Sequence, residues 1–286
     1  MVAQPVLISI VTPSFNQVEW VERTMQSVLN QPVDGIEYVV VDGMSVDGTI
    51  DVLERYRSRL TKLVIEPDSG MYEAINKGFA MTTGNLMGWI NSDDMLHPHA
   101  LQTVLRIFSD LPEVEWITGC RSVFDELDCC VATEPAAAWS HAKVLCGDYK
   151  WIQQESTFWR RSLYERAGGY ISTQYRLAGD FELWCRFFAH APLYSTDALL
   201  GGFRVRRAGQ ASLEGLGAYE AEVNVLLAAT ERGPDLAAAV SAYQHNQHTG
   251  LVNKLKRKIL GQSKAAVFPP RIYFDRHEQR FKLQPI

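Results

Sequence analysis

The chain has 286 residues, of which 47% are hydrophobic and 21% charged, and its formal net charge is −5. This composition is typical of a globular protein with a sizeable core, and no stretch approaches the ~18 apolar residues that span a bilayer. From Leu251 onward nine Lys or Arg stand against two acids, so the body is acidic and the tail basic. The acidic body argues against a nucleic-acid partner, because nucleic-acid binding needs a broad basic surface.

The expected compartment follows from the cysteines and the N-terminus. The five cysteines are odd in number and lack metal-type spacing, which favours reduced thiols in a cytoplasmic protein. The chain starts directly with a strand pattern, without the basic and apolar regions of a secretory signal. We therefore expect a cytoplasmic protein.

Strand and helix patterns alternate over about the first 94 residues. Largely apolar and β-branched runs predict buried strands at 6–11, 36–41, 62–65 and 86–90. Amphipathic patterns predict helices at 18–30, 50–59 and 71–79. This alternation predicts an α/β fold with a Rossmann-like, mostly parallel central sheet and helices on both faces.

Polar residues follow all four of these strands, at Asn16, Asp42, Asp68 and the Asp93-Asp94 pair. Ligands of open parallel sheets bind at the carboxyl ends of the strands, so these side chains predict a binding edge. Asp42 lies before any helix that it could cap, whereas helix capping is an alternative role for Asp47. No Gly-x-Gly-x-x-Gly follows the first strand, which disfavours a dinucleotide-binding dehydrogenase.

The segment Asn91-Ser92-Asp93-Asp94 places two carboxylates side by side after an apolar run. Neighbouring carboxylates repel each other unless a cation lies close, and a hard divalent ion with oxygen ligands is the simplest partner. The alternative is that both aspartates cap the helix that starts near His97-Pro98.

The second half of the chain carries more strands and helices. We expect a helix at 97–110, a strand pair formed by 115–119 and 121–126, a strand at 156–159 and a short helix from Ser162. A helix follows at 179–188, with Asp180 in its first turn, where an acid also suits the helix dipole. An extended segment is expected at 193–205 and helices at 213–230 and 236–247.

Five of these segments together resemble the family 2 glycosyltransferases, which have the GT-A fold. They are Thr12-Pro13-Ser14-Phe15-Asn16, Val41 to Thr49, Glu66 to Gly78, Asn91 to Asp94, and Asp180 with Leu183-Trp184. The third resembles a subgroup that is common in cell-surface polysaccharide assembly. The resemblance covers roughly residues 6–212 and implies a catalytic domain at 1–212, with a nucleotide-binding half (1–94), an acceptor half (95–212) and a helical extension (213–286).

The resemblance implies a role for each matched position. Asp180 is the expected catalytic base, and Asp93 and Asp94 are the expected ligands of Mg²⁺ or Mn²⁺. Donor-binding residues are expected at Thr12, Pro13, Ser14, Asn16, Asp42, Ser45, Asp68, Asn76, Asn91 and Asp93. Two positions depart from the family pattern: Asn91 replaces the first acid of Asp-x-Asp, and 204–212 lacks a histidine that some relatives place there.

The implied reaction is transfer of a sugar, with inversion, from a nucleotide diphosphate sugar to the hydroxyl of a saccharide or lipid-linked saccharide. The donor is expected to be UDP-linked, with Asp42 accepting a hydrogen bond from uracil. One alternative is a sugar nucleotidyltransferase, although the loop from Thr12 to Asn16 lacks the glycines and cations that a triphosphate needs. The other is a non-catalytic nucleotide-sugar-binding protein.

The basic segment 251–264 has apolar residues at four-residue spacing, Leu251, Leu255 and Ile259, among lysines and arginine. Such a helix can lie on the inner face of an anionic membrane, near a lipid-linked acceptor. Equally, it can pack on the domain and leave its basic face in water.

Overall fold

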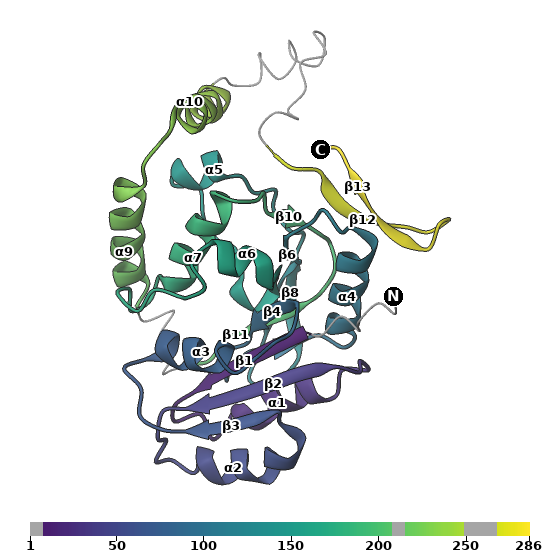
Figure 1. Cartoon of the computed structure of the whole chain (residues 1–286), viewed down its shortest axis with the longest axis vertical. Coiled ribbons are helices and arrows are strands. Elements are labelled where there is room, and N and C mark those ends of the chain that lie inside the picture. The colour runs from purple at the N-terminus through teal and green to yellow at the C-terminus, as the bar shows by residue number, and fades with distance from the viewer. Residues whose placement is uncertain (1–7, 208–214, 249–267) are drawn as a thin grey trace.

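The computed structural model describes residues 8–207, 215–248 and 268–286 (Figure 1). The described residues form a central sheet of seven strands in the order β10-β6-β9-β4-β1-β2-β3. These strands are β1 (Ile8–Ser14), β2 (Ile36–Asp42), β3 (Lys62–Ile65), β4 (Leu86–Trp89), β6 (Trp116–Thr118), β9 (Thr157–Arg160) and β10 (Tyr194–Ser195). β1 to β4 are parallel, and β9 is antiparallel to both of its neighbours. The predicted mostly parallel sheet is confirmed.

Helices cover both faces of this sheet, as predicted. Ile8 and Ile10 pack on one side, while the alternate residues Val11 and Val39 pack on the other, because successive side chains of a strand point to opposite faces. The first face is covered by α1 (Val21–Leu29), α2 (Thr49–Tyr56) and α4 (Ala100–Asp110), and the second by α3 (Met71–Phe79), α6 (Arg161–Arg166) and α7 (Gly179–Phe188). Trp184 of α7 packs within this second face and is 1% exposed.

The predicted strand pair at 115–126 is wrong. β6 pairs with β9 and β10, whereas β7 (Arg121–Phe124) belongs to a second sheet of order β5-β11-β7-β8. Its other strands are β5 (Met95–Leu96), β8 (Cys130–Glu134) and β11 (Gly201–Arg204). The chain changes sheet at Gly119, where a Cβ atom would lie 2.7 Å from the Ala198 carbonyl oxygen. Long-range pairing therefore overrides the local pattern that suggested a hairpin.

The helices predicted at 213–230 and 236–247 are present as α9 (Leu216–Ala229) and α10 (Pro234–His248). α10 packs on α5 (His141–Leu145), a helix that was not predicted. Two short 3₁₀ turns, η1 (Arg57–Arg59) and η2 (Gln154–Ser156), complete the helical elements of the described residues.

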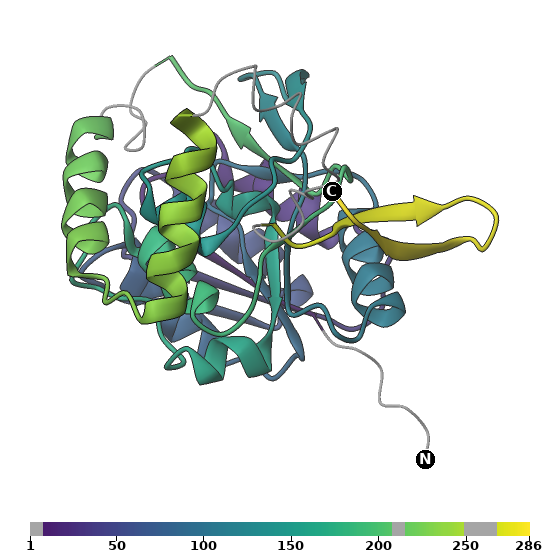
Figure 2. The ribbon, with the colours of Figure 1, turned by 90° about the horizontal axis from the view of Figure 1, so that it is seen from above.

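The chain then adds an unpredicted hairpin, β12 (Arg271–Asp275) and β13 (Arg280–Gln284), which projects from the body beside α4 (Figure 2). The Arg106 guanidinium lies over Phe274 and Phe281 and attaches the hairpin to α4. The basic segment 251–264, expected to form an amphipathic helix, lies outside the described residues, as does the start of the first predicted strand. Across the described ranges, no helix combines the length and apolar character needed to cross a membrane.

Candidate active site

The carboxyl ends of β1, β2 and β4 meet at one edge of the sheet because the three strands are parallel and Ser14 pairs in register with Asp42. Asp42 is fully buried, and its two carboxylate oxygens accept hydrogen bonds from the Ser45 amide, at 2.8 Å, and the Ser45 hydroxyl, at 2.7 Å. Ser14 is buried, and its hydroxyl finds no hydrogen-bond partner within the described part of the chain. Ser14 and Asp42 therefore form a polar floor at this edge.

The loops after β1 and β2 are joined by Asn16. The Asn16 backbone amide donates to the Ser45 hydroxyl at 2.8 Å, and the Asn16 side-chain oxygen accepts from the Val46 backbone amide at 2.9 Å. Phe15 and Met44, on these loops, are 58% and 48% exposed. Apolar side chains at a polar edge offer a surface for a planar base. The motif quoted from the sequence contained Phe15, but no role was predicted for it, although an aromatic residue inside a polar loop was a usable signal.

Thr12 and Pro13 lie within β1 itself and are buried. The Thr12 hydroxyl lies 2.9 Å from the Tyr38 hydroxyl, inside the fold. Burial raises the pKa of Tyr38 far above its ordinary value, so this pair stays neutral.

Asp68 lies against the same edge from the end of β3. Its carboxylate accepts the Gly70 amide at 2.9 Å, and a Cβ atom at Gly43 would be only 2.8 Å from its other oxygen. Burial raises the pKa of Asp68, and the nearby charge of Asp42 contributes in the same direction. Asn76, one helical turn into α3, exchanges two hydrogen bonds of 2.8 Å with the backbone of Ile171, so in this structure its amide connects α3 to that loop.

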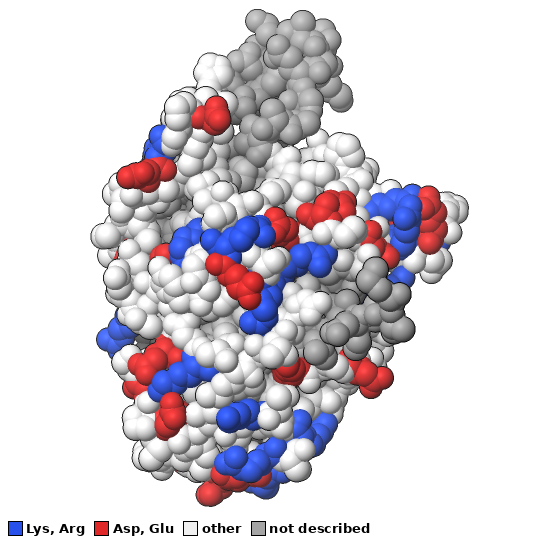
Figure 3. Space-filling view, in the orientation of Figure 1, with Lys and Arg blue, Asp and Glu red and all other residues white. Residues whose placement is uncertain are grey.

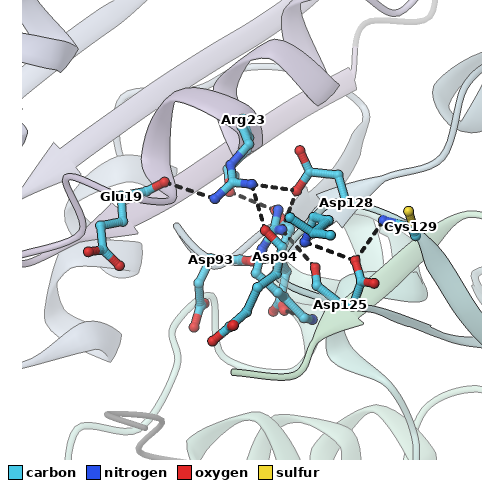
Figure 4. Close-up of polar contacts among 11 residues, drawn as sticks. Glu19, Arg23, Asp93, Asp94, Asp125, Asp128 and Cys129 are labelled. Atoms are coloured by element: carbon cyan, nitrogen blue, oxygen red, sulfur yellow. Dashed lines mark hydrogen bonds and ion pairs between the residues drawn. The ribbon is translucent and has the colours of Figure 1, made fainter. Parts of the chain in front are cut away.

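Asp93 and Asp94 follow β4 and are held by β11 (Figure 4). The Arg206 guanidinium forms an ion pair of 2.9 Å with the Asp93 carboxylate. Asp94 is 1% exposed, and its carboxylate accepts the Arg204 amide at 2.8 Å. The pKa of Asp94 is raised well above its ordinary value by burial and by the charge of Asp93.

Arg204 organises this region from inside the protein, since it is fully buried. Its guanidinium donates to the Asp93 carbonyl at 2.6 Å and to the Asp128 carboxylate, which also receives Arg23 at 3.1 Å. Figure 4 shows Arg23 and Asp128 beside the two aspartates. Buried cations next to Asp93 and Asp94 make this edge suitable for a strongly anionic group.

The residues around Asp93 fit a hard divalent cation. The Asn91 side-chain oxygen is buried and has no hydrogen-bond partner within the described residues, and its amide nitrogen lies 3.4 Å from Asp94. Two carboxylates and an amide oxygen suit an ion that completes its shell with water and phosphate oxygens. No cluster of three or more His, Cys, Asp or Glu that could hold a metal occurs among the described residues, so the ligand would have to supply the remaining oxygens.

Asp180 lies in the first turn of α7, as predicted. Its carboxylate accepts the Phe181 amide at 2.8 Å, and the Tyr72 hydroxyl lies 3.4 Å away. Burial raises the pKa of Asp180 to about 6.

A second acid, Glu155, connects Asp180 to Asp93. Glu155 is 4% exposed and belongs to η2, which the Gln154 amide ties to the Trp89 carbonyl at the end of β4. Burial raises the pKa of Glu155 to about 7, and the charges of Asp180 and Asp93 both contribute. Glu155 therefore lies within electrostatic reach of both Asp93 and Asp180. No role for Glu155 was predicted from the sequence.

Comparison with known proteins assigns this edge to a family. The model of glycosyl transferase family 2 matches residues 9–128, which contain Asn16, Asp42, Asp68 and Asp93. These residues are a family 2 glycosyltransferase domain. Over 107 residues the chain is 33% identical to TuaG of Bacillus subtilis, a putative teichuronic acid biosynthesis glycosyltransferase. The alignment covers 36% of this chain and 42% of TuaG, so it spans less than half of that relative.

Two solved structures share the fold over most of the chain. S. aureus TarS 1–349, crystallised in complex with UDP-GlcNAc, superposes with a TM-score of 0.65 at 16% identity, covering 85% of this chain and 72% of that chain. The mannosyltransferase PcManGT from Pyrobaculum calidifontis, in complex with GDP-Man and Mn²⁺, gives a TM-score of 0.61 at 17% identity, covering 82% and 67%. The predicted GT-A fold of the family 2 domain is therefore confirmed.

Proposed function

We propose that the protein is an inverting glycosyltransferase that transfers a sugar from a nucleotide diphosphate sugar, UDP-linked, to an acceptor hydroxyl in surface polysaccharide or glycolipid assembly. One observation carries the proposal: the buried Glu155 lies within electrostatic reach of both Asp93 and Asp180, which are far apart in the chain. TuaG is named for teichuronic acid biosynthesis and TarS was crystallised with UDP-GlcNAc, which supports the donor and acceptor classes.

The donor would bind along the β1 and β2 ends. Asp42, held by Ser45, would accept a hydrogen bond from the base, and the exposed ring of Phe15 would stack on it. Ser14, Asn16, Asp68 and the other matched positions would line the nucleoside and sugar parts of this pocket. Asn76 stays a predicted donor ligand, although its amide is engaged by Ile171 in this structure.

The diphosphate would lie at Asp93. Mg²⁺ or Mn²⁺ held there, with Asp94 and Asn91, would act as a Lewis acid for the leaving group. PcManGT was solved with Mn²⁺, which supports this choice of ion. Arg206, which pairs with Asp93 in this structure, would contact the phosphates once the donor binds, because a guanidinium can bind two oxygens at once.

Asp180 would act as the base for the acceptor hydroxyl. A sugar hydroxyl is a poor nucleophile, and a positioned base typically contributes ~10²–10⁴-fold in rate. Its pKa of about 6 leaves Asp180 ionised at neutral pH while making it more basic than an exposed aspartate. Inversion needs a single displacement, so no covalent intermediate should form on Asp180.

A donor screen tests the proposal. Nucleotide diphosphate sugars are compared by thermal shift with and without Mn²⁺, and release of nucleoside diphosphate is measured for those that bind. Asp180→Asn should abolish release while leaving donor binding intact. Release of pyrophosphate from a nucleoside triphosphate would instead favour a sugar nucleotidyltransferase, and donor binding without turnover would favour a sensor or scaffold.

We also propose that the protein works in the cytoplasm and that its basic segment 251–264 contacts the membrane surface that carries a lipid-linked acceptor. Vesicles with anionic lipid should bind the chain weakly, and added salt should release it because the attraction is electrostatic. If the protein does not bind anionic vesicles even at low salt, the proposed membrane contact is wrong, and the alternative that segment 251–264 packs on the domain is favoured.

A further inference from the structure

The loop that leads into Asp180 is held by a single carboxylate from α9. Glu222 accepts three backbone hydrogen bonds from consecutive residues: one oxygen receives the Arg176 amide at 3.0 Å, and the other receives Leu177 at 3.0 Å and Ala178 at 2.8 Å. α7 begins at the next residue, Gly179. The position of Asp180 therefore depends directly on where Glu222 holds this loop.

The same loop is held from the opposite side by α3. The Tyr72 hydroxyl donates to the Leu177 carbonyl at 2.7 Å. The Tyr72 ring lies against Gly179, where an added Cβ atom would come within 2.7 Å of a ring carbon. Between Tyr72 and Glu222, residues 176–179 have hydrogen bonds on their carbonyl and amide sides and little room to shift.

Glu222 is not one of many surface charges. The helix α9, Leu216–Ala229, contains two charged residues, Glu220 and Glu222. Glu220 pairs with Lys150, and Glu222 is occupied by the loop. In the view of Figure 3 the surface over α9 is largely uncharged, whereas acids and bases alternate over the middle of the molecule. Both acids of α9 are therefore used for specific contacts with the catalytic domain.

We propose that Glu222 is a positioning residue for Asp180. By binding the backbone amides of 176–178, it fixes the start of α7 and thereby the orientation of the Asp180 carboxylate. The proposal rests on the proposed role of Asp180. It also gives the extension a function, because α9 lies outside the segment 9–128 that matches the family model. The acceptor side of the site is complete only when α9 is docked.

The charge of Glu222 gives this role a signature in the pH dependence. The ionisable groups around Asp180 come from three other elements: Tyr72 on α3, Glu155 in η2, and Tyr219 with Glu222 on α9. On α7 itself, Glu182 is paired with Arg186. Burial is the largest cause of the raised pKa of Asp180, and the hydrogen bonds of its carboxylate oppose that shift. The charge of Glu222 is a smaller influence, which also raises the pKa of Asp180. Removing this charge should lower the pKa of Asp180.

The test compares Glu222→Gln and Glu222→Ala with Glu231→Gln, a matched control at an exposed acid just beyond α9. Hydrogen exchange of the full-length protein directly measures how well the backbone amides of the loop before α7 are protected. The peptide that covers 176–180 should exchange about tenfold faster or more in both Glu222 variants, because charge-assisted hydrogen bonds are lost. A peptide from β2 should be unchanged, and the control should match the parent throughout.

Steady-state kinetics with the donor selected by the screen then test whether Glu222 positions Asp180. For Glu222→Ala we expect kcat to fall about 10- to 100-fold, since small misplacements of a catalytic group are costly, while the donor Kd stays within about twofold. For Glu222→Gln we expect a smaller fall, with the acidic limb of the kcat/KM profile moved to lower pH. A merely structural role would reduce the folded fraction without moving that limb.

The outcomes separate this inference from the proposed function. If Asp180→Asn abolishes turnover but both Glu222 variants keep the parent kcat and acidic limb, Glu222 does not position the base, and the proposed function stands. If Asp180→Asn retains turnover, the base assignment fails and the inference fails with it. Should Glu222→Ala not fold, Glu222→Gln, which keeps the size of the side chain and one acceptor oxygen, carries the same comparisons.

Discussion

Substituting Asp180 by Asn should make the protein more stable at neutral pH while removing its activity. Asp180 is buried, and its pKa is raised from 3.8 to about 6. The native state therefore disfavours the charged carboxylate that the proposed reaction needs. Asparagine can accept the same hydrogen bond from the Phe181 amide, so the substitution mainly removes the charge.

The magnitude follows from the two pKa values. A folded-state pKa above the unfolded one means that the native state binds the proton more tightly, so protonation stabilises it at low pH. That stabilisation is fully present below the unfolded pKa of 3.8 and is lost as the pH rises through about 6. At about 1.36 kcal/mol per pKa unit, the loss is about 3 kcal/mol in total, and about half of it falls between about pH 5 and pH 7.5.

Urea unfolding at several pH values measures this difference. The free energy of unfolding of Asp180→Asn should exceed that of the parent by an amount that grows by about 1.4 kcal/mol from about pH 5 to pH 7.5. Asp51→Asn, at an exposed acid in the first turn of α2, should show no such growth. A gap that stays constant with pH would refute the raised pKa of Asp180 and the reasoning that makes it a neutral-pH base.

Three further predictions concern the packing around Gly201, the stacking of Phe15 on the nucleotide base, and the metal. In thermal unfolding, Gly201→Ala should destabilise the protein by about 3 kcal/mol or more, because the new Cβ atom would lie 1.9 Å from the Glu155 carbonyl oxygen. The control Gly217→Ala should be neutral or stabilising, because its Cβ atom would meet open space within α9. Phe15→Ala should weaken donor binding by about 1–3 kcal/mol without lowering Tm, while Val225→Ala, equally exposed on α9, should leave the calorimetric donor affinity unchanged. Chelation with EDTA should stop nucleoside diphosphate release and added Mn²⁺ should restore it; in Asp93→Asn the restoring concentration should rise, and turnover that is indifferent to chelation would contradict the metal proposal.

The sequence by itself determined the first four strands of the sheet and most of their polar edge. β1 to β4 are short, largely apolar strands that lead into polar residues, and both the strand period and the chain order are local properties. For the same reason α7 was predicted with its bounds and with Asp180 in its first turn. The family pattern then gave Asp42, Asp93 and Asp180 their expected roles, because these positions lie inside short, recognisable segments.

Only the tertiary structure decided which charges meet. Arg206 pairs with Asp93, and Glu222 holds the loop before Asp180, although long stretches of chain separate the partners. Glu155 reaches the centre because η2 is tied to the end of β4, and β6 and β7 fall into different sheets although they are neighbours in sequence. Such contacts depend on how whole elements pack, and packing is set by side chains distant in the chain, so no local pattern records them.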